Sequence, residues 1–296
     1  METRILGATG IEVTRLGVGL SEIREVDVNT VEKLLNTALD QGINFLDTSA
    51  CYGNSEELVG KTVSNRRSEF SLATKCGHIT GGYDGIAWTA ETIKHSIDRS
   101  LSRMKTDHLD LVQLHSCDKE ILEQGEVIDE LLKAKNSGKT RFIGYSGDNE
   151  NAEWAVQSGI FDTLQTSFSL VDQKARNGLL KLAKSNSMGI IIKRPIGNGV
   201  WGKSAAASSY TEEYFNRARA MLDLGELAGG DDRIALAIGF LFSHEEISTA
   251  IIGTTNANHL LSNIQMLENG ISVPPETIFE LTKRFKKLGS NWFQMN

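Results

Sequence analysis

Short apolar runs alternate with amphipathic segments along most of the chain of 296 residues. Eight runs have the composition and length of strands: 15–19, 44–47, 70–75, 109–115, 142–146, 163–166, 190–194 and 248–252. Apolar residues at helical spacing predict helices at 30–40, 89–104, 119–135, 150–157, 175–185 and 258–268. This alternation is typical of a parallel sheet, because the connection between two parallel strands is usually a helix.

Local signals mark the ends of several elements. Asn29 is placed to cap the helix at 30–40, and Gly42 is placed to end it. Two prolines, at 274 and 275, predict the start of a last helix, on which Lys283, Arg284, Lys286 and Lys287 are expected to form a solvated face.

Eight strands in one series favour an α/β fold of the closed (β/α)8 type, a TIM barrel. An open doubly wound sheet has the same elements and is the alternative. Segment 4–13 alternates around a glycine-containing turn, which predicts an N-terminal β-hairpin placed to plug the bottom of the barrel. The segments at 197–209 and 225–232, rich in small residues, are interpreted as long loops, and the whole chain, 1–296, is expected to form one domain.

Composition excludes several classes of protein. With 31 basic and 38 acidic residues the net charge is −7, which disfavours nucleic acid as a partner. The longest apolar run, 234–242, is far shorter than the roughly 20 residues that span a bilayer, and the first residues lack the apolar core of a signal peptide. We therefore expect a cytoplasmic protein with no membrane contact. The three cysteines lack CxxC spacing, so no disulfide framework and no metal site are predicted, and the pattern gives no oligomeric state.

Four polar residues stand at or after the ends of neighbouring predicted strands, where a barrel of this type carries its chemistry. They are Asp47, Tyr52, Lys75 and His115. Each alone has a structural explanation, as a cap, a rim residue or a satisfied core residue. Together they form a proton-transfer set, because a phenol needs a neighbouring positive charge to favour its phenolate. Lys75 supplies that charge, Asp47 holds the lysine, and His115 is expected to hydrogen-bond a carbonyl oxygen.

This constellation resembles the aldo-keto reductase family over nearly the whole chain. The matching motifs, in order, are LGATG at 6–10, NFLDTSACYGNSE at 44–56, ATK at 73–75 and DLVQLH at 110–115. The resemblance implies that Asp47, Tyr52, Lys75 and His115 are the catalytic tetrad of a single barrel domain. It also implies a nicotinamide cofactor, NADPH or less often NADH, across the barrel mouth.

The resemblance further implies a set of cofactor-binding residues. Ser146 and Gln165 match positions that bind the nicotinamide carboxamide. The family often has an asparagine directly after this serine, where this chain has Gly147, and Asn149 is expected to make that asparagine's contact instead. For Lys193 and Arg194 two interpretations stay open: stacking of the guanidinium on nicotinamide, or strand-end ions paired elsewhere. The remaining positions are Gly19, Gly199, Gly253, Thr254, Thr255, His259 and Asn263. Segment 252–263 has no Lys or Arg for a 2′-phosphate, yet NADPH is the expected cofactor.

The segment GNGVWG at 197–202 satisfies G-x-G-x-x-G and follows a predicted strand. We reject a Rossmann interpretation, because the motif lies two thirds along the chain, follows Pro195 and leads into a stretch rich in Ser and Ala. A flexible glycine loop over the cofactor pyrophosphate is the better description.

The expected function is NAD(P)H-dependent reduction of an aldehyde, ketone or sugar, a small-molecule carbonyl substrate, with Tyr52 as general acid. One alternative is an alcohol or sugar dehydrogenase that works mainly in oxidation. Another is a cofactor-sensing regulatory subunit of the same fold. Rim residues expected near the substrate are Ile23, Trp88, Trp201 and either Trp292 or Phe293, with packing of hydrophobic surface as the alternative role of each.

Overall fold

Parallel strands close into a barrel in the computed structural model, which describes residues 1–228, 232–271 and 273–295. The barrel strands are β3 (Leu16–Gly19), β4 (Phe45–Asp47), β5 (Ser71–Cys76), β6 (Leu109–His115), β7 (Thr140–Ser146), β8 (Thr163–Ser167), β9 (Gly189–Lys193) and β10 (Thr249–Gly253). Each pairs with its sequence neighbour, and β10 pairs with β3 to close the ring. The predicted barrel is confirmed, and the open sheet is excluded.

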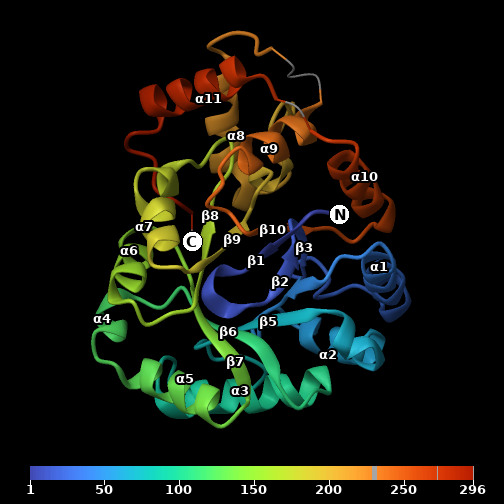
Figure 1. The fold of residues 1–296 in the computed structure, drawn as a ribbon, viewed down its shortest axis with the longest axis vertical. Helices are drawn as coiled ribbons and strands as arrows, with labels where there is room; N and C mark the ends of the chain where they lie inside the picture. Colours follow the sequence, from blue (N-terminus) through green and yellow to red (C-terminus); the bar gives the residue numbers. More distant parts are fainter. Residues whose placement is uncertain (229–231, 272, 296) are drawn as a thin grey trace.

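Helices surround the barrel (Figure 1). They are α1 (Val28–Asp40), α2 (Ser55–Thr62), α3 (Ala90–Met104), α4 (Lys119–Leu122), α5 (Glu126–Asn136), α6 (Asn149–Ser158), α7 (Leu179–Ser185), α8 (Ser209–Leu222), α9 (Arg233–Phe242), α10 (Ala257–Glu268) and α11 (Pro275–Leu288). Their apolar faces and the outward side chains of the strands form the main buried core. None of the helices in the described residues is both long and apolar enough to cross a membrane.

Three local expectations were wrong, each for a backbone reason. Helix α1 begins at Val28 and its cap is Asp27, not Asn29, because Asp27 is extended and its carboxylate accepts from the Thr30 amide at 3.0 Å. The helix expected at 119–135 is two helices, since Gly125 has φ = 81° and cannot continue a right-handed helix. Gly178, at φ = 126°, likewise separates a 3-10 turn at Lys174–Arg176 from α7.

The predicted hairpin is present, as β1 (Thr3–Ile5) paired antiparallel with β2 (Glu12–Thr14). Figure 1 looks onto this end of the barrel, with the hairpin in front of the strands. Leu6, Ile11 and Val13 are buried and pack against inward side chains of the barrel. A Cβ on Gly7 would lie 2.2 Å from the Gly189 amide nitrogen, so the turn lies directly against the start of β9. The hairpin therefore plugs the bottom of the barrel.

The basic residues of α11 do not all face solvent. Arg284 is 3% exposed, and its guanidinium donates to the carbonyl oxygens of Met221 and Gly225, each at 2.8 Å. The expectation of a wholly solvated face was wrong for this residue, because Arg284 ties α11 to the end of α8. Lys283 remains exposed, at 68% of its side chain.

We expect Arg284→Met to lower the free energy of unfolding by about 1–3 kcal/mol, because it leaves buried carbonyl oxygens without donors. Lys283→Met, one residue away on the exposed face, is the matched control and is expected to change it by less than about 0.5 kcal/mol. Urea unfolding followed by circular dichroism measures both. Equal effects of the two substitutions would contradict the anchoring role of Arg284.

Candidate active site

Neighbouring strand ends bring together the four residues of the expected tetrad. Asp47 is the last residue of β4, Lys75 is next to last in β5, and His115 is last in β6. Tyr52 lies in the loop between β4 and α2. The carboxyl ends of parallel strands meet at one rim of the barrel, opposite the hairpin, so the four side chains face one another there.

The centre of the site is a buried ion pair. The Lys75 ammonium lies 2.5 Å from Asp47 Oδ2 and also donates to the Thr48 carbonyl oxygen at 2.8 Å. Both charged side chains are 1% exposed. Burial is the largest influence on the pKa of Lys75 and lowers it, but the charge and hydrogen bond of Asp47, together with the neighbouring Tyr52, hold that pKa above its ordinary value. Lys75 is therefore a fixed positive charge.

The second oxygen of Asp47 is held by two amides. Gln113 and Gln165 donate to Asp47 Oδ1 at 3.2 and 2.8 Å, and Ser146 donates to the Gln165 side-chain oxygen at 2.9 Å. Ser146 and Gln165, expected at the nicotinamide carboxamide, are thus linked to the tetrad through Asp47. This connection was not part of the sequence-based expectation.

Tyr52 lies between the two basic groups. Its ring centroid is 4.9 Å from the Lys75 ammonium and 5.8 Å from the His115 ring centroid, with the two rings nearly perpendicular. Burial raises the pKa of the Tyr52 phenol, and the Lys75 charge opposes that rise without cancelling it. The phenol therefore carries its proton at neutral pH, as a proton donor requires.

His115 is a neutral imidazole. Its Nδ1 lies 3.2 Å from Ser49 Oγ and 3.3 Å from the sulfur of Cys51, which is an exposed free thiol. Burial lowers the pKa of His115 well below its usual value, and the nearby charge of Lys75 lowers it further. The Ser49 hydroxyl and the Cys51 thiol can each donate to Nδ1, and a neutral ring that accepts there carries its proton on Nε2.

This depressed pKa predicts a pH dependence of stability. Below about pH 6.5 the unfolded chain takes up a proton at His115 that the folded chain refuses, so stability falls as the pH falls, by roughly 1 kcal/mol for each unit. His115→Gln removes this contribution, and its loss of stability between pH 7 and pH 5 should be smaller than that of wild type. Urea unfolding at both pH values measures it, with His108→Gln, at a half-exposed histidine outside the site, as control. Identical pH slopes in wild type and His115→Gln would contradict the prediction.

Helix α2, which follows the Tyr52 loop, is anchored by a buried carboxyl group that sequence reasoning missed. Glu56 is fully buried, and its Oε1 accepts from Thr74 at 2.7 Å and from Ser100 at 2.6 Å. Thr74 directly precedes Lys75, so Glu56 fixes the loop and the lysine strand relative to each other. The periodicity did not reveal helix α2. The only sequence signal for Glu56 was its position in the first turn of that helix.

Lys193 and Arg194 at the end of β9 contact a buried carboxylate. The Lys193 ammonium lies 2.9 Å and the Arg194 guanidinium 3.9 Å from Asp148 Oδ2. Burial alone would raise the pKa of Asp148, but Lys193 and the Ser167 amide hold it below its ordinary value. The structure thus has the ion-paired arrangement of these two residues, whereas stacking of Arg194 on a nicotinamide stays a prediction. Asp148 follows the end of β7 by two residues, a position that could have singled it out.

The C-terminal segment lies against the same part of the rim. Gln294 donates to the Ser167 carbonyl oxygen at 2.7 Å, and Asn149 donates from its side chain to the Gln294 carbonyl at 3.1 Å. Arg217 donates to the Phe293 carbonyl at 2.8 Å, and Arg194 donates to that of Met295. Asn149, expected as a substitute carboxamide ligand, is therefore directed to the C-terminal segment in this structure.

The other expected cofactor residues lie on loops after β9 and β10. The glycine segment forms a single 3-10 turn at Gly197–Gly199 and does not lead directly into a helix, in agreement with the rejection of a Rossmann motif. Thr254, Thr255 and His259 flank the start of α10, whose cap Asn256 accepts from the Asn258 amide at 2.9 Å. Gly19 and Gly253 end β3 and β10 and pair in register, and Asn263 lies further along α10.

Several of these groups have the capacity to hold a nicotinamide cofactor. The Gln165 amide has two N–H donors and an oxygen with two lone pairs, and the contacts to Asp47 and Ser146 use one of each. A Cβ at Gly199 would meet nothing within 4 Å, so the loop leaves room for a ligand. The first amides of α10, a helix of 12 residues, suit a phosphate group.

Barrel, plug and rim site together have the arrangement of an enzyme that transfers protons at the mouth of a barrel. The aldo/keto reductase family model matches residues 15–281, and the chain belongs to this family of oxidoreductases. Members of the family typically use NAD(P)H.

Relatives with named activities match over nearly the whole length. The 6-dehydroglucose reductase of Novosphingobium aromaticivorans is 30% identical over 283 residues, which cover 90% of each chain. The L-galactose dehydrogenase of Arabidopsis thaliana is 28% identical over 300 residues, covering 95% of this chain and 93% of the relative. The holo form of an aldo-keto reductase from Bacillus halodurans shares the fold, with a TM-score of 0.84 at 22% identity over 96% of both chains.

Proposed function

We propose that the protein catalyses NAD(P)H-dependent reduction of a carbonyl group to an alcohol, with Tyr52 as general acid. The observation that carries the proposal is the position of the Tyr52 ring, 4.9 Å from the Lys75 ammonium and 5.8 Å from the His115 ring. When bound, a reduced nicotinamide supplies the hydride that the carbonyl carbon accepts.

The residues of the chain handle the carbonyl oxygen. Tyr52 transfers its proton to the oxygen as negative charge develops there, and Lys75 stabilises the phenolate that remains. His115 donates a hydrogen bond from Nε2 to the same oxygen. Asp47 keeps Lys75 in place, and its bonds from Gln113 and Gln165 keep the carboxylate oriented.

A sugar or another polyhydroxy aldehyde is the proposed substrate class. Two relatives are named for reactions of sugars, one as a reductase and one as a dehydrogenase: a 6-dehydroglucose reductase and an L-galactose dehydrogenase. The same tetrad works in oxidation with Tyr52 as base, so the second candidate function is a sugar dehydrogenase that uses NAD(P)+.

The test is cofactor binding followed by turnover. Fluorescence titration should show binding of NADPH, more tightly than NADH, and initial rates with a panel of aldehydes and sugars should show oxidation of NADPH at 340 nm. Reverse reactions with the corresponding alcohols and NADP+ decide the direction. Absence of binding of both cofactors would overturn the proposal, whereas tighter binding of NADH would overturn only the choice of NADPH.

A further inference from the structure

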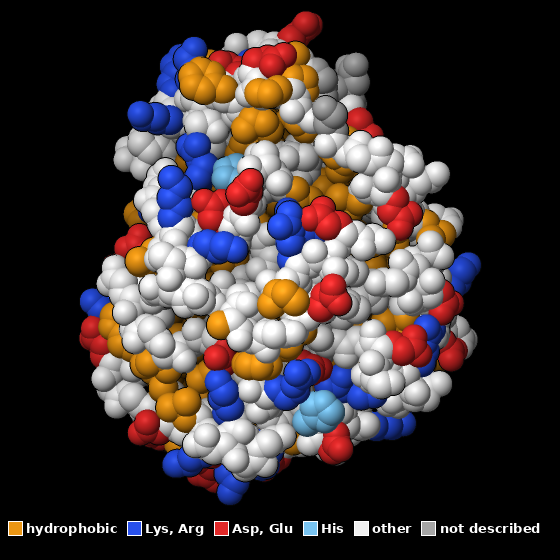
Figure 2. Space-filling view, viewed as in Figure 1, with side chains coloured by type: hydrophobic (Ala, Val, Ile, Leu, Met, Phe, Trp, Pro, Cys, Tyr) orange, Lys and Arg blue, Asp and Glu red, His pale blue; other side chains and the backbone are white. Residues whose placement is uncertain are grey.

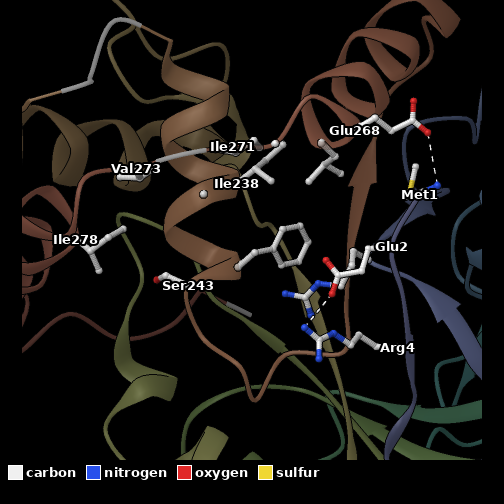
Figure 3. A pocket seen from close by; sticks show the side chains of 14 residues that line it. Met1, Glu2, Arg4, Ile238, Ser243, Glu268, Ile271, Val273 and Ile278 are labelled. Atoms are coloured by element: carbon white, nitrogen blue, oxygen red, sulfur yellow. Dashed lines mark ion pairs between the residues drawn. The ribbon is translucent and has the colours of Figure 1, made fainter.

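A pocket of about 490 Å³ lies at the plugged end of the barrel, away from the tetrad (Figure 3). It is half open, and its lining comes from the first residues of the chain and β1, from Arg15 directly before β3, from the second half of α9, from the end of α10 and from the start of α11. The volume is in the range of about 300–1,000 Å³ that small-molecule sites occupy. In the space-filling view of this face, apolar surface is visible in a hollow between basic and acidic side chains above the centre (Figure 2).

One side of the pocket is apolar. The lining side chains on this side come from α9, α10, α11 and the segment before α11: Ile238, Phe242, Leu267, Ile271, Val273 and Ile278. Figure 3 shows Ile238, Ile271 and Ile278 around the same space. Such a wall suits a hydrocarbon chain, because apolar surface gains free energy when it leaves water.

The other side carries a buried cation, Arg15. This residue is 5% exposed, its guanidinium lies 4.1 Å from the Phe242 ring centroid, and Nη1 donates to the carbonyl oxygens of Ile247 and Ser248. Among the described residues no carboxylate lies within 4.0 Å of it. Burial lowers the pKa of Arg15, to about 10, and the charge of Glu2 offsets only part of this shift. A buried charge without an ionic partner is unfavourable until an anion compensates it.

Both carboxylates that line the pocket already have an ionic partner. Glu2 pairs with Arg4 at 2.8 Å, and Glu268 pairs with the Met1 ammonium at 3.5 Å, as the dashed lines in Figure 3 show. At the polar side of the pocket, as far as the structure describes the chain, the Glu2 carboxylate is therefore the one negative charge near two guanidinium groups, those of Arg4 and Arg15. This side has an excess of one positive charge.

We propose that the pocket binds an amphipathic monocarboxylate, a medium-chain fatty acid or an acid of similar shape. The carboxylate lies on the Arg15 guanidinium, whose planar donors match two carboxylate oxygens, and the chain lies against the wall formed by Ile238, Ile271 and Ile278. A cationic amphiphile would be repelled by Arg15, and a neutral alcohol would leave its charge uncompensated.

This site is separate from the catalytic one. Arg15 precedes β3, whereas the tetrad lies at the opposite ends of the strands, and four residues of β3 span roughly 13 Å. The carboxylate therefore does not compete with cofactor or substrate, and its effect reaches the enzyme through the stability of the plugged end. The inference does not depend on the proposed reaction.

Isothermal titration with decanoate below its micellar concentration tests the proposal, with decanol and decylamine as probes of the same chain length. Wild type should bind decanoate at least tenfold more tightly than either probe, and its melting temperature should rise with decanoate concentration. Arg15→Met should weaken decanoate binding at least tenfold. Ile278→Trp, which fills the apolar side and leaves Arg15 in place, should do the same.

The half-exposed Arg141→Met is the matched control, because it also removes a guanidinium but lies on β7, four strands away from β3 in the ring, and it should bind decanoate as wild type does. If Arg15→Met fails to fold, Ile278→Trp decides the location of binding. Unchanged binding in Ile278→Trp overturns the proposal, as does equal affinity for decanol, or no binding of decanoate at about 1 mM, where the standard free energy would be near −4 kcal/mol.

Discussion

Replacing Tyr52 by Phe is expected to lower kcat for carbonyl reduction by about 10²- to 10⁴-fold, the usual contribution of a positioned proton donor. The ring is kept, so its contacts with Lys75 and His115 remain, and affinity for the cofactor should change little. The effect should therefore fall on the chemical step and not on binding. Steady-state rates and fluorescence titration of the same preparations separate the two.

The control for this substitution is Tyr83→Phe. Tyr83 is a half-buried tyrosine whose ring stacks on His95 at a centroid distance of 3.9 Å, outside the tetrad. It should keep wild-type kcat. Full activity of Tyr52→Phe would show that Tyr52 is not the general acid, although the fold and the family membership would stand.

Replacing Lys75 by Met is expected to have the largest effect on stability. It leaves the Asp47 carboxylate, 1% exposed, as an uncompensated buried charge, and breaking a buried pair in this way costs about 3–5 kcal/mol. Activity should fall as well, because no positive charge would stabilise the Tyr52 phenolate. Urea unfolding and steady-state rates measure the two losses.

The double variant Asp47→Asn/Lys75→Met separates charge from packing. It removes both ions, and an asparagine at position 47 retains an acceptor for Gln113 and Gln165. Stability should return to within about 1–2 kcal/mol of wild type, whereas activity should stay as low as in Lys75→Met. If the double variant were as unstable as the single one, the unpaired charge would not be the cause of the loss.

The barrel could be predicted because strand signals are local. Each of the eight strands lies within two residues of its predicted bounds, and strand order follows once neighbours are parallel. The meeting of Asp47, Lys75 and His115 followed from the same rule, since each lies in the last two residues of a neighbouring strand. Helix breaks were harder: nothing in the periodicity at 119–135 distinguishes a tolerated glycine from Gly125 in a left-handed conformation.

Long-range partners could not be predicted. Asp148 meets Lys193, Arg284 meets the end of α8, and Gln294 meets Ser167, each across a distance in sequence at which no pattern specifies contact. The pocket around Arg15 could not be predicted for the same reason, because its lining residues come from segments near both ends of the chain. A resemblance to a family gives the residues that the family shares, and none of these contacts belonged to the matched motifs.

The pairing of the last barrel strand with the first has a consequence for biosynthesis. The side chain of Thr249 donates to the Thr14 carbonyl across 235 positions, and Arg15 reaches the Ile247 carbonyl across 232. Until β10 emerges from the ribosome, β3 and β9 each expose an unpaired edge, which other chains could use for aggregation. A nascent chain stalled before residue 249 should therefore depend on chaperones, and closure of the ring should be a slow, late step in folding, because contacts so distant in sequence form slowly.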